Sequence, residues 1–210
     1  MSNIIISNDY IDEMDDLTLF LYTSTQMYMR HSIPYIRMPR EKFYDDAFQI
    51  NHLTKKQREN VDNALNQLQE YGLLDNGDHI NIYPPKFKMP DGILCTFIDT
   101  DVFYSIFNSN YRPDVKWALF HYYCRLISSL DYNITIYNKK GVVGHMPQAF
   151  FMYKTGLSQQ TISKYHKYLE DLQLIYTSRC KYNIQNGKRR NNYYGRYEDR
   201  KLIDKFVVST

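Results

Sequence analysis

Residues 146–175, MPQAFFMYKTGLSQQTISKYHKYLEDLQLI, decide the fold of this chain. The stretch predicts a short helix, a tight turn and a second helix. Pro147 suits the first turn of a helix, where its missing N–H costs nothing, and Gly156 can take the positive φ that the turn needs. Ser158 is a good N-cap, because its hydroxyl can accept a hydrogen bond from an orphan N–H of the second helix. The pattern is that of a helix-turn-helix, whose second helix enters a DNA major groove.

The second predicted helix has an apolar face and a polar face. The apolar stripe repeats at spacings of three and four and should face a core, through Ile162, Tyr165, Leu169 and Leu172. The opposite face carries amides, hydroxyls and ammonium groups and no carboxylate. We assign contacts with base edges and phosphates to Gln159, Gln160, Ser163, Lys164 and Lys167. An ordinary solvated helix surface would look similar, so the flanking sequence has to decide.

The sequence after residue 175 predicts a basic β-hairpin. Asn186-Gly187 lies between two β-prone runs and fits a type I′ turn, which needs positive φ at both positions. A hairpin that directly follows a recognition helix is the wing of a winged helix. The alternative is a basic hairpin that only meets solvent. We expect phosphate contacts from the wing residues Arg179, Lys181, Lys188, Arg189, Arg190 and Arg196.

Charge and cysteine usage narrow the class of protein. Residues 151–210 hold 12 Lys or Arg against 5 Asp or Glu, a net of +7, whereas residues 1–150 hold 14 against 18, a net of −4. A basic C-terminal third indicates that nucleic-acid contact is concentrated there. Three widely spaced cysteines without a Cys-x-x-Cys pair fit a reducing cytoplasm. No apolar run reaches the roughly 18 residues of a membrane span, and no secretory signal is evident, so we expect a cytoplasmic protein without a membrane partner.

The N-terminal part repeats the same order of elements. It predicts a helix over residues 16–30, a strand over 33–38, a helix opened by Pro39, and a long helix over 55–71. Thr54 caps the long helix, Gly72 ends it, and a hairpin turns at Asn76-Gly77-Asp78. Residues 68–74 align with residues 169–175, which indicates a short internal repeat.

The predicted fold class is therefore mainly α with small β hairpins (α+β), arranged as tandem winged helix-turn-helix domains. We expect an N-terminal winged-helix-like domain at residues 1–84, a linker at 85–95 and a C-terminal DNA-binding domain at 96–210, with the proline pair Pro84-Pro85 at the first boundary.

The two predicted recognition helices differ in charge. In the first, the inward stripe is Val61, Ala64, Leu65 and Leu68, and the outward face holds Glu59, Asn63, Asn66 and Glu70 with Asp62 at its border. Carboxylates on that face would repel phosphates. We therefore expect the C-terminal copy to be the main DNA reader, and the N-terminal copy to mediate protein contact or to bind DNA weakly.

Residues 96–179 resemble the winged-helix domains of replication initiators and DnaD-like proteins of Firmicute plasmids and phages. The residues that carry the resemblance are Phe97-Ile98-Asp99, Lys116-Trp117-Ala118-Leu119-Phe120, residues 156–165, Leu169, Leu172 and Leu174-Ile175. The resemblance implies a DNA-binding protein of a mobile element. It does not separate replication from transcription, and it does not extend to the N-terminal half.

The sequence offers no candidate catalytic site. It has no P-loop and no dinucleotide fingerprint, and its six histidines lack a metal-ligand spacing. His121 lies in an apolar helix and is expected to be a satisfied core residue, and Asp99 and Asp101 fit a turn or a helix cap. The run Tyr193-Tyr194-Gly195-Arg196-Tyr197 could stack single-stranded bases, or its rings could pair within the wing strands.

We therefore expect a non-enzymatic, site-specific double-stranded DNA-binding protein without cofactor or metal. It would act in replication initiation or transcriptional control, as a homodimer, with a protein partner on its N-terminal domain. The alternative is a winged-helix adaptor that binds protein and does not itself recognise a DNA sequence. A nuclease or relaxase ranks last, because no site supports it.

Overall fold

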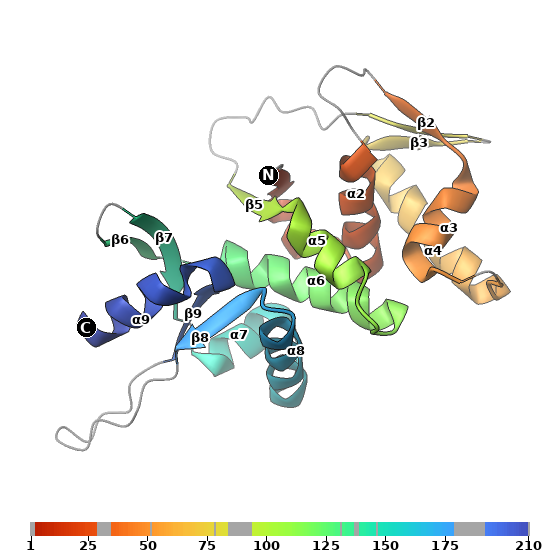
Figure 1. Ribbon diagram of the computed structural model, residues 1–210. Helices are drawn as coiled ribbons and strands as arrows, with labels where there is room; N and C mark the ends of the chain where they lie inside the picture. The colour runs from red at the N-terminus through yellow and green to blue at the C-terminus, as the bar shows by residue number, and fades with distance from the viewer. Residues whose placement is uncertain are drawn as a thin grey trace. The chain divides into compact units, whose positions relative to one another are not determined.

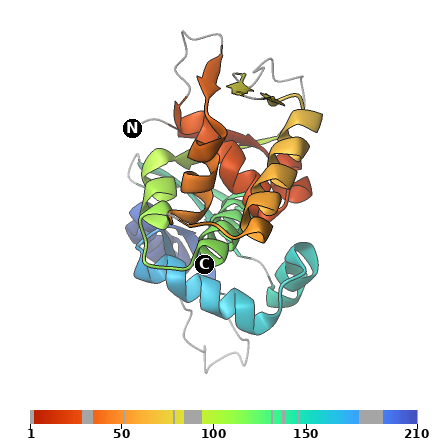
Figure 2. The same ribbon diagram turned by 90° about the vertical axis from the view of Figure 1, so that its right-hand side faces the viewer.

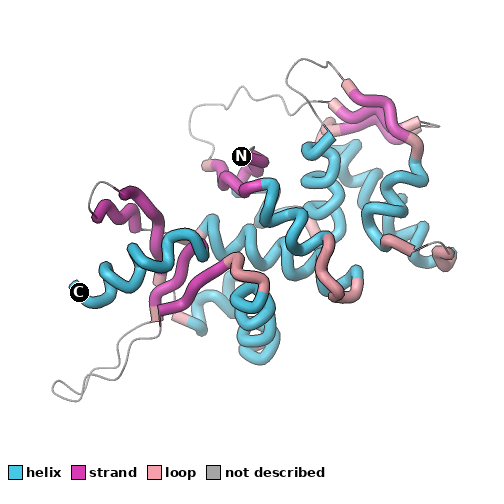
Figure 3. Tube along the Cα trace, viewed as in Figure 1, coloured by secondary structure: helices cyan, strands magenta, loops and turns pink. Residues whose placement is uncertain are grey.

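The computed structural model describes residues 3–28, 35–50, 52–77, 79–83, 94–130, 132–136, 139–145, 147–178 and 192–209. The protein is α+β, as the sequence predicts, with helices and three small antiparallel sheets (Figure 3). It divides into two compact units, Met1–His121 and Tyr122–Thr210. The division falls inside one long helix, α6 (Pro113–Ser128), whose two halves belong to different units.

The first unit is built around three helices and a three-stranded sheet. The helices α2 (Asp16–Tyr28), α3 (Arg40–Phe48) and α4 (Lys55–Glu70) pack against one another (Figures 1 and 2). The sheet has the order β2-β4-β3, so the strand before α3 pairs with the second strand of the hairpin after α4. Its strands are β2 (Ile36–Met38), β3 (Leu74–Asn76) and β4 (Ile80–Ile82).

A second, two-stranded sheet joins the beginning of the chain to residues beyond the predicted linker. β1 (Asn3–Ser7) pairs antiparallel with β5 (Cys95–Asp99), with Ile5 opposite Phe97. Helix α1 (Asn8–Glu13) follows β1 and helix α5 (Thr100–Phe107) follows β5. The first residues of the chain thus form an edge strand, and residues 96–121, which the sequence assigns to the C-terminal domain, lie in the first unit.

Aromatic rings and one indole hydrogen bond hold the first half of α6 in the first unit. The Phe20 ring of α2 lies 5.0 Å from the Phe103 ring and 6.1 Å from the Phe120 ring. The Trp117 indole N–H donates to the Ala47 carbonyl at the end of α3 (2.9 Å). These contacts explain why the division follows residue 121 and does not fall at the proline-rich stretch near residue 84.

The second unit has a four-stranded sheet and three helices besides its half of α6. The sheet has the order β6-β7-β9-β8. As in the first unit, the strand before the helix pair (β7) lies beside the second strand after that pair (β9). Its elements are β6 (Tyr132–Ile136), β7 (Lys139–Gly144), α7 (Gln148–Thr155), α8 (Gln159–Asp171), β8 (Ile175–Ser178), β9 (Tyr193–Arg196), the 3-10 turn Tyr197–Asp199 and α9 (Arg200–Ser209).

Helices α4 and α8 end in the same way at the positions that the internal repeat aligns. The Leu73 N–H donates to the Leu68 carbonyl (3.0 Å), and the Leu174 N–H donates to the Leu169 carbonyl (2.9 Å). The residue before each donor has positive φ, which is 68° at Gly72 and 55° at Gln173. This is the Schellman termination, in which a left-handed residue lets the chain turn back and satisfy helix carbonyls. Both helices then lead directly into a strand.

Candidate nucleic-acid interface

The turn between α7 and α8 forms as the sequence predicts. Gly156 has φ of 69°, and its N–H donates to the Met152 carbonyl at the end of α7 (2.9 Å). The Ser158 hydroxyl accepts from the Thr161 N–H at the start of α8 (3.2 Å). Pro147 lies at the N-cap of α7, one residue before the predicted position. Local residue chemistry thus sets the start of α8 and the direction in which its first turn points.

The polar face of α8 is exposed. All five α8 residues that the sequence assigns to DNA are solvent-exposed, namely Gln159, Gln160, Ser163, Lys164 and Lys167. On the opposite side Ile162 and Leu169 are buried, whereas Tyr165 and Leu172 are half-buried. The Lys164 ammonium lies 5.5 Å from the centre of the Tyr168 ring. In the part of the chain that the structure describes, the other four polar side chains have no polar partner of their own.

One part of the prediction for this face needs correction. The face was expected to lack a carboxylate, but Asp171 is exposed and follows Lys167 by one helical turn. Asp171 is the last residue of α8, about 16 Å along the helix from Gln160 at 1.5 Å per residue. The first three turns carry no carboxylate, so the positive charge is concentrated toward the start of the helix.

The inward side of α8 is fixed to the second half of α6. The Tyr122 ring packs against the rings of Phe151 and Tyr165, with centroids 5.4 and 5.6 Å apart. Its hydroxyl hydrogen-bonds the His166 Nδ1. Burial raises the pKa of Tyr122, so the hydroxyl stays protonated in this contact. The Arg125 guanidinium donates to the Thr155 carbonyl at the end of α7 (3.3 Å). The helix pair is therefore held as one rigid body that presents the polar face of α8.

The strands that follow α8 pair as a wing requires. β8 and β9 are antiparallel, with Ser178 opposite Tyr193. Arg196 lies in β9, is half-buried, and has one guanidinium nitrogen 3.8 Å from a Glu198 carboxylate oxygen, so part of its charge is already balanced. The Asn186-Gly187 turn and the other predicted wing residues lie outside the described residues. These wing residues are Arg179, Lys181, Lys188, Arg189 and Arg190.

The aromatic run at the start of β9 serves packing. Tyr194 is buried, and its ring packs against the His166 ring of α8 with centroids 5.9 Å apart. Tyr193 packs against Phe206 of α9 with centroids 5.5 Å apart. Both rings are therefore used inside the unit, but among the described residues they pack against helices α8 and α9 and not against other rings of the wing strands.

Helix α9 was missed by the sequence analysis. Its Leu202 and Ile203 pack with Val143 in a buried cluster on one face of the sheet. The spacing of Leu202, Ile203, Phe206 and Val207 at i, i+1, i+4 and i+5 is the signal that could have found it. The Asp204 carboxylate accepts from the Tyr176 hydroxyl of β8 (2.8 Å), a bond that raises the pKa of Tyr176.

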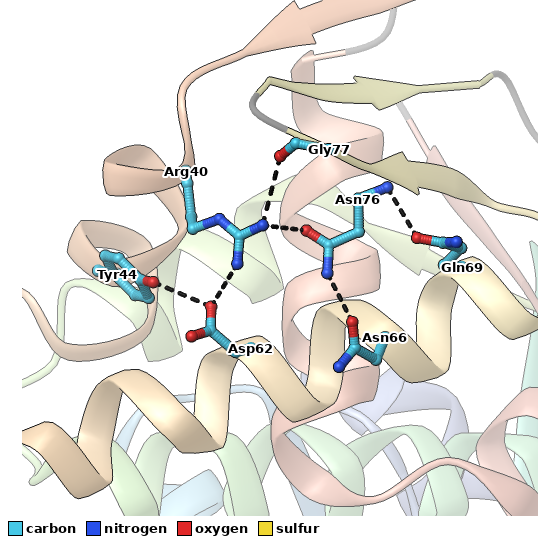
Figure 4. A network of polar contacts seen from close by, with 7 residues as sticks. All are labelled: Arg40, Tyr44, Asp62, Asn66, Gln69, Asn76 and Gly77. Atoms are coloured by element: carbon cyan, nitrogen blue, oxygen red, sulfur yellow. Dashed lines mark hydrogen bonds and ion pairs between the residues drawn. The ribbon is translucent and has the colours of Figure 1, made fainter.

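The matching face of α4 is engaged by its own unit (Figure 4). Arg40 of α3 donates to Asp62 (2.7 Å), to the side-chain oxygen of Asn76 (2.7 Å) and to the Gly77 carbonyl (3.3 Å). Asn76 in turn donates to Asn66 (2.7 Å). These bonds tie the tip of the hairpin to the outward stripe of α4. The predicted burial of Val61, Ala64, Leu65 and Leu68 and the exposure of Glu59, Asn63, Asn66 and Glu70 are confirmed.

The net charges of the two structural units differ more than those of residues 1–150 and 151–210. Residues 122–210 hold 15 Lys or Arg against 6 Asp or Glu, a net of +9, and residues 1–121 hold 11 against 17, a net of −6. The division inside α6 therefore separates a basic unit, which contains α8, from an acidic unit, which contains α4. A polyanion is attracted to the first and repelled by the second.

The candidate catalytic residues have structural roles. Asp99 is the N-cap of α5, and its carboxylate accepts from the Asp101 N–H (3.0 Å). His121 is buried, and its two ring nitrogens lie 2.6 Å from an Asp16 carboxylate oxygen and 2.6 Å from the Ile11 carbonyl. Within the described ranges no group of three His, Cys, Asp or Glu residues could hold a metal ion. Among the same residues no helix is long and apolar enough to cross a membrane.

Comparison of the chain with protein-family models, with curated proteins and with solved structures gives no match. The resemblance to winged-helix proteins of mobile elements therefore stays a prediction.

Proposed function

We propose that the protein binds double-stranded DNA at specific sites, with α8 as the recognition helix and the β8–β9 hairpin as a wing. The observation that carries this proposal is the polar stripe of α8. Four of its exposed side chains have no polar partner among the described residues, although the unit pairs many of its other polar groups internally. Amides and hydroxyls can bond base edges, and ammonium groups can contact phosphates.

The proposed fold is a pair of winged helix-turn-helix units. Each unit has a strand, two helices and two strands in that order, namely β2-α3-α4-β3-β4 and β7-α7-α8-β8-β9. In each sheet the strand before the helix pair lies beside the last strand, in the orders β2-β4-β3 and β7-β9-β8. The common Schellman end of α4 and α8 supports a duplicated ancestor for the two units.

The process served by this binding comes from the resemblance alone. It is replication initiation or transcriptional control in a plasmid or phage, and the protein acts in the cytoplasm without a cofactor and without catalysing a reaction. A single recognition helix with its wing covers little DNA, so we propose that a homodimer binds two half-sites about 34–36 Å apart. Footprinting that shows one short half-site under a bound monomer would contradict the dimer.

The direct test is duplex binding as a function of salt. If about five phosphates are neutralised, the logarithm of the affinity should fall against the logarithm of the salt concentration with a slope of roughly −4 to −5. A fluorescently labelled duplex and anisotropy at several salt concentrations measure this slope. A flat response, or no binding at low salt, would remove DNA binding as the function.

A second candidate is a protein-binding adaptor, and the acidic first unit favours it. That unit has a net charge of −6, and its three-stranded sheet carries an open hollow of about 620 Å³. The lining residues are Tyr35, Arg37, Gly77, His79, Asn81 and Tyr83. Cross-linking of the full chain in a host lysate, with and without duplex DNA, separates the two candidates. The adaptor requires a protein partner that persists when DNA is absent.

A further inference from the structure

Gln160 occupies the centre of the outward face of α8 in its first turn. At 100° per residue it lies about 160° around the helix from the buried Ile162, whereas Gln159 lies only about 60° from it. Lys164 and Lys167 follow Gln160 by four and seven residues on the same stripe. In a helix-turn-helix the first residues of the recognition helix contact base edges. Gln160 is therefore the side chain on this stripe that is placed for base contact.

The hydroxyls of Ser158 and Thr161, on either side of Gln160 in the sequence, are already used. Ser158 and Thr161 lie 2.9 Å apart through their hydroxyl oxygens, and Ser158 also accepts from the Thr161 N–H. The Gln160 amide has no polar partner among the described residues, and it is exposed. An amide offers one acceptor and one donor side by side, so its best partner presents one donor and one acceptor in the same spacing.

Adenine presents that pair in the major groove, through its N6 amino group and N7. Guanine presents two acceptors there, O6 and N7, so one half of an amide would face a like group. Guanine is usually read by arginine or lysine, and α8 contains no arginine. The Lys164 ammonium lies over the Tyr168 ring one turn further along α8, on the side away from Gln160, so it does not compete for the base-reading position.

We propose that Gln160 reads one adenine in each half-site by a bidentate contact to N6 and N7, with Lys164 and Lys167 on the flanking phosphates. This inference rests on the proposed duplex binding and adds the identity of the base that the helix selects. The half-site should contain an A·T pair at the position that faces the first turn of α8, and replacement of that pair by G·C should weaken binding at least tenfold.

The experiment starts with selection of bound sequences from a randomised duplex, followed by substitution of single atoms. In the selected site the adenine is replaced by 7-deazaadenine, which lacks the N7 acceptor and keeps the amino group. Binding should weaken about five- to tenfold at that position and remain unchanged when an adenine outside the half-site is replaced. In a parallel arm 7-deazaguanine replaces each guanine of the site and should have little effect.

Two variants of the full chain complete the test. Gln160→Glu should change the preferred base at this position from adenine to cytosine, because a carboxylate accepts from the cytosine amino group. Gln173→Glu adds the same charge just past the end of α8, at an exposed residue outside the set assigned to DNA, and should leave the preference for adenine in place. For each variant, the affinity for the duplex with adenine is divided by the affinity for the duplex with cytosine. A general loss of affinity from the added charge cancels in this ratio.

The possible results separate the inference from the function it rests on. The adenine contact is overturned if the wild-type protein selects guanine at this position and its binding weakens when 7-deazaguanine replaces that guanine. Base reading would then be assigned to lysine. Binding without preference at this position also overturns it, whereas duplex binding itself stands. No duplex binding by the wild-type protein removes both.

Discussion

Helices α4 and α8 hold the same position in two segments with the same order of elements, β2-α3-α4-β3-β4 and β7-α7-α8-β8-β9, yet their polar faces are used differently. On α4 the side chains of Asp62, Asn66 and Gln69 bond α3 and the hairpin of their own unit. On α8 the equivalent face stays open to solvent. A new partner of α4 would have to displace hydrogen bonds within the protein, whereas a partner of α8 would displace only hydrogen bonds with water.

The sheets of the two units differ as well. In the second unit α9 covers one face, where Leu202 and Ile203 pack with Val143. In the first unit the corresponding face carries Arg37, Asn81 and Asp75 in register across three strands. The second unit therefore has a covered sheet and an exposed α8 face, whereas the first has a bonded α4 face and an exposed polar sheet face.

The largest expected effect concerns DNA affinity. Lys164→Glu with Lys167→Glu should weaken duplex binding at least a hundredfold, because two phosphate contacts become like-charge repulsions. The matched control is Asn60→Glu with Asn63→Glu on α4, where both residues are exposed and lie outside the Arg40 network. It should change affinity less than threefold. Anisotropy titration measures both, and a reversed result would assign DNA binding to the first unit.

The covered sheet of the second unit should be sensitive to one added methyl group. In Gly195→Ala the new Cβ would lie 2.7 Å from the Val142 carbonyl oxygen and 3.0 Å from the Ile203 Cδ1. The backbone and α9 must both move, which should cost about 2–3 kcal/mol. Urea unfolding followed by circular dichroism measures the loss. A variant as stable as the wild type would show that α9 does not pack closely on this sheet.

Alkaline pH should destabilise both units through their buried tyrosines. Burial raises the pKa of Tyr22 in the first unit and of Tyr122 in the second well above the usual value of 10.0. Each ring keeps its proton in the folded state and loses it in the unfolded state above about pH 10. The stability it contributes is complete below that pH and declines as pH rises, by about 1.4 kcal/mol per tyrosine at pH 11.

Urea titrations at pH 8 and pH 11 measure this loss, and absorbance at 295 nm reports tyrosine ionisation. Between pH 8 and pH 11, Tyr22→Phe should lose about 1.4 kcal/mol less of its free energy of unfolding than the wild type loses. An equal loss of stability in this variant and in the wild type would contradict the assignment of Tyr22 as a tyrosine that stays protonated.

The polar face of α4, which bonds Arg40 and the hairpin through Asp62, Asn66 and Gln69, should contribute to the stability of the first unit and not to DNA affinity. Arg40→Met removes the bonds to Asp62, Asn76 and Gly77 and should cost about 1 kcal/mol, since the pair is partly exposed. Lys55→Met removes only an exposed 3.7 Å ion pair and should cost less than about 0.5 kcal/mol. A loss of DNA affinity in Arg40→Met alone would give α4 a part in binding.

The smallest expected change in stability concerns the Schellman termination that α4 and α8 share. Gln173 has a φ of 55°, which strains a residue with a side chain, whereas the equivalent residue of α4 is Gly72. Gln173→Gly should stabilise the second unit by about 0.5–1 kcal/mol. Gly72→Ala should destabilise the first by about 1 kcal/mol, although nothing lies within 4 Å of the new Cβ. Thermal unfolding of both variants measures these changes. Equal and opposite shifts support the equivalence of the two ends.

Most of the second unit could be predicted from local residue chemistry. The cap at Ser158, the turn at Gly156 and the apolar stripe of α8 depend on residues within one or two helical turns, so spacing alone reveals them. The exposure of the five α8 residues follows from the same periodicity. The inward role of Tyr194 does not, because it depends on a ring of α8 that packs against β9.

The division of the chain could not be predicted in the same way. The proline-rich stretch near residue 84 is typical of a linker, but β1 pairs with β5 across it, and the Thr96 hydroxyl donates to Asn8 (2.7 Å). Such pairing depends on residues almost ninety positions apart, and a single sequence carries no record of which edge strands meet. The Arg40–Asp62 bond was missed for the same reason.

By itself, the sequence determined where α4 begins and ends, where α8 begins, and which side of each of these two helices is apolar. These features follow from side-chain size, capping groups and backbone preference within a few residues. The tertiary structure alone decided which polar groups are used internally and which stay open. Pairing of Asp62 with Arg40, and the absence of such a pair at Gln160, depend on which elements the fold brings within hydrogen-bond distance.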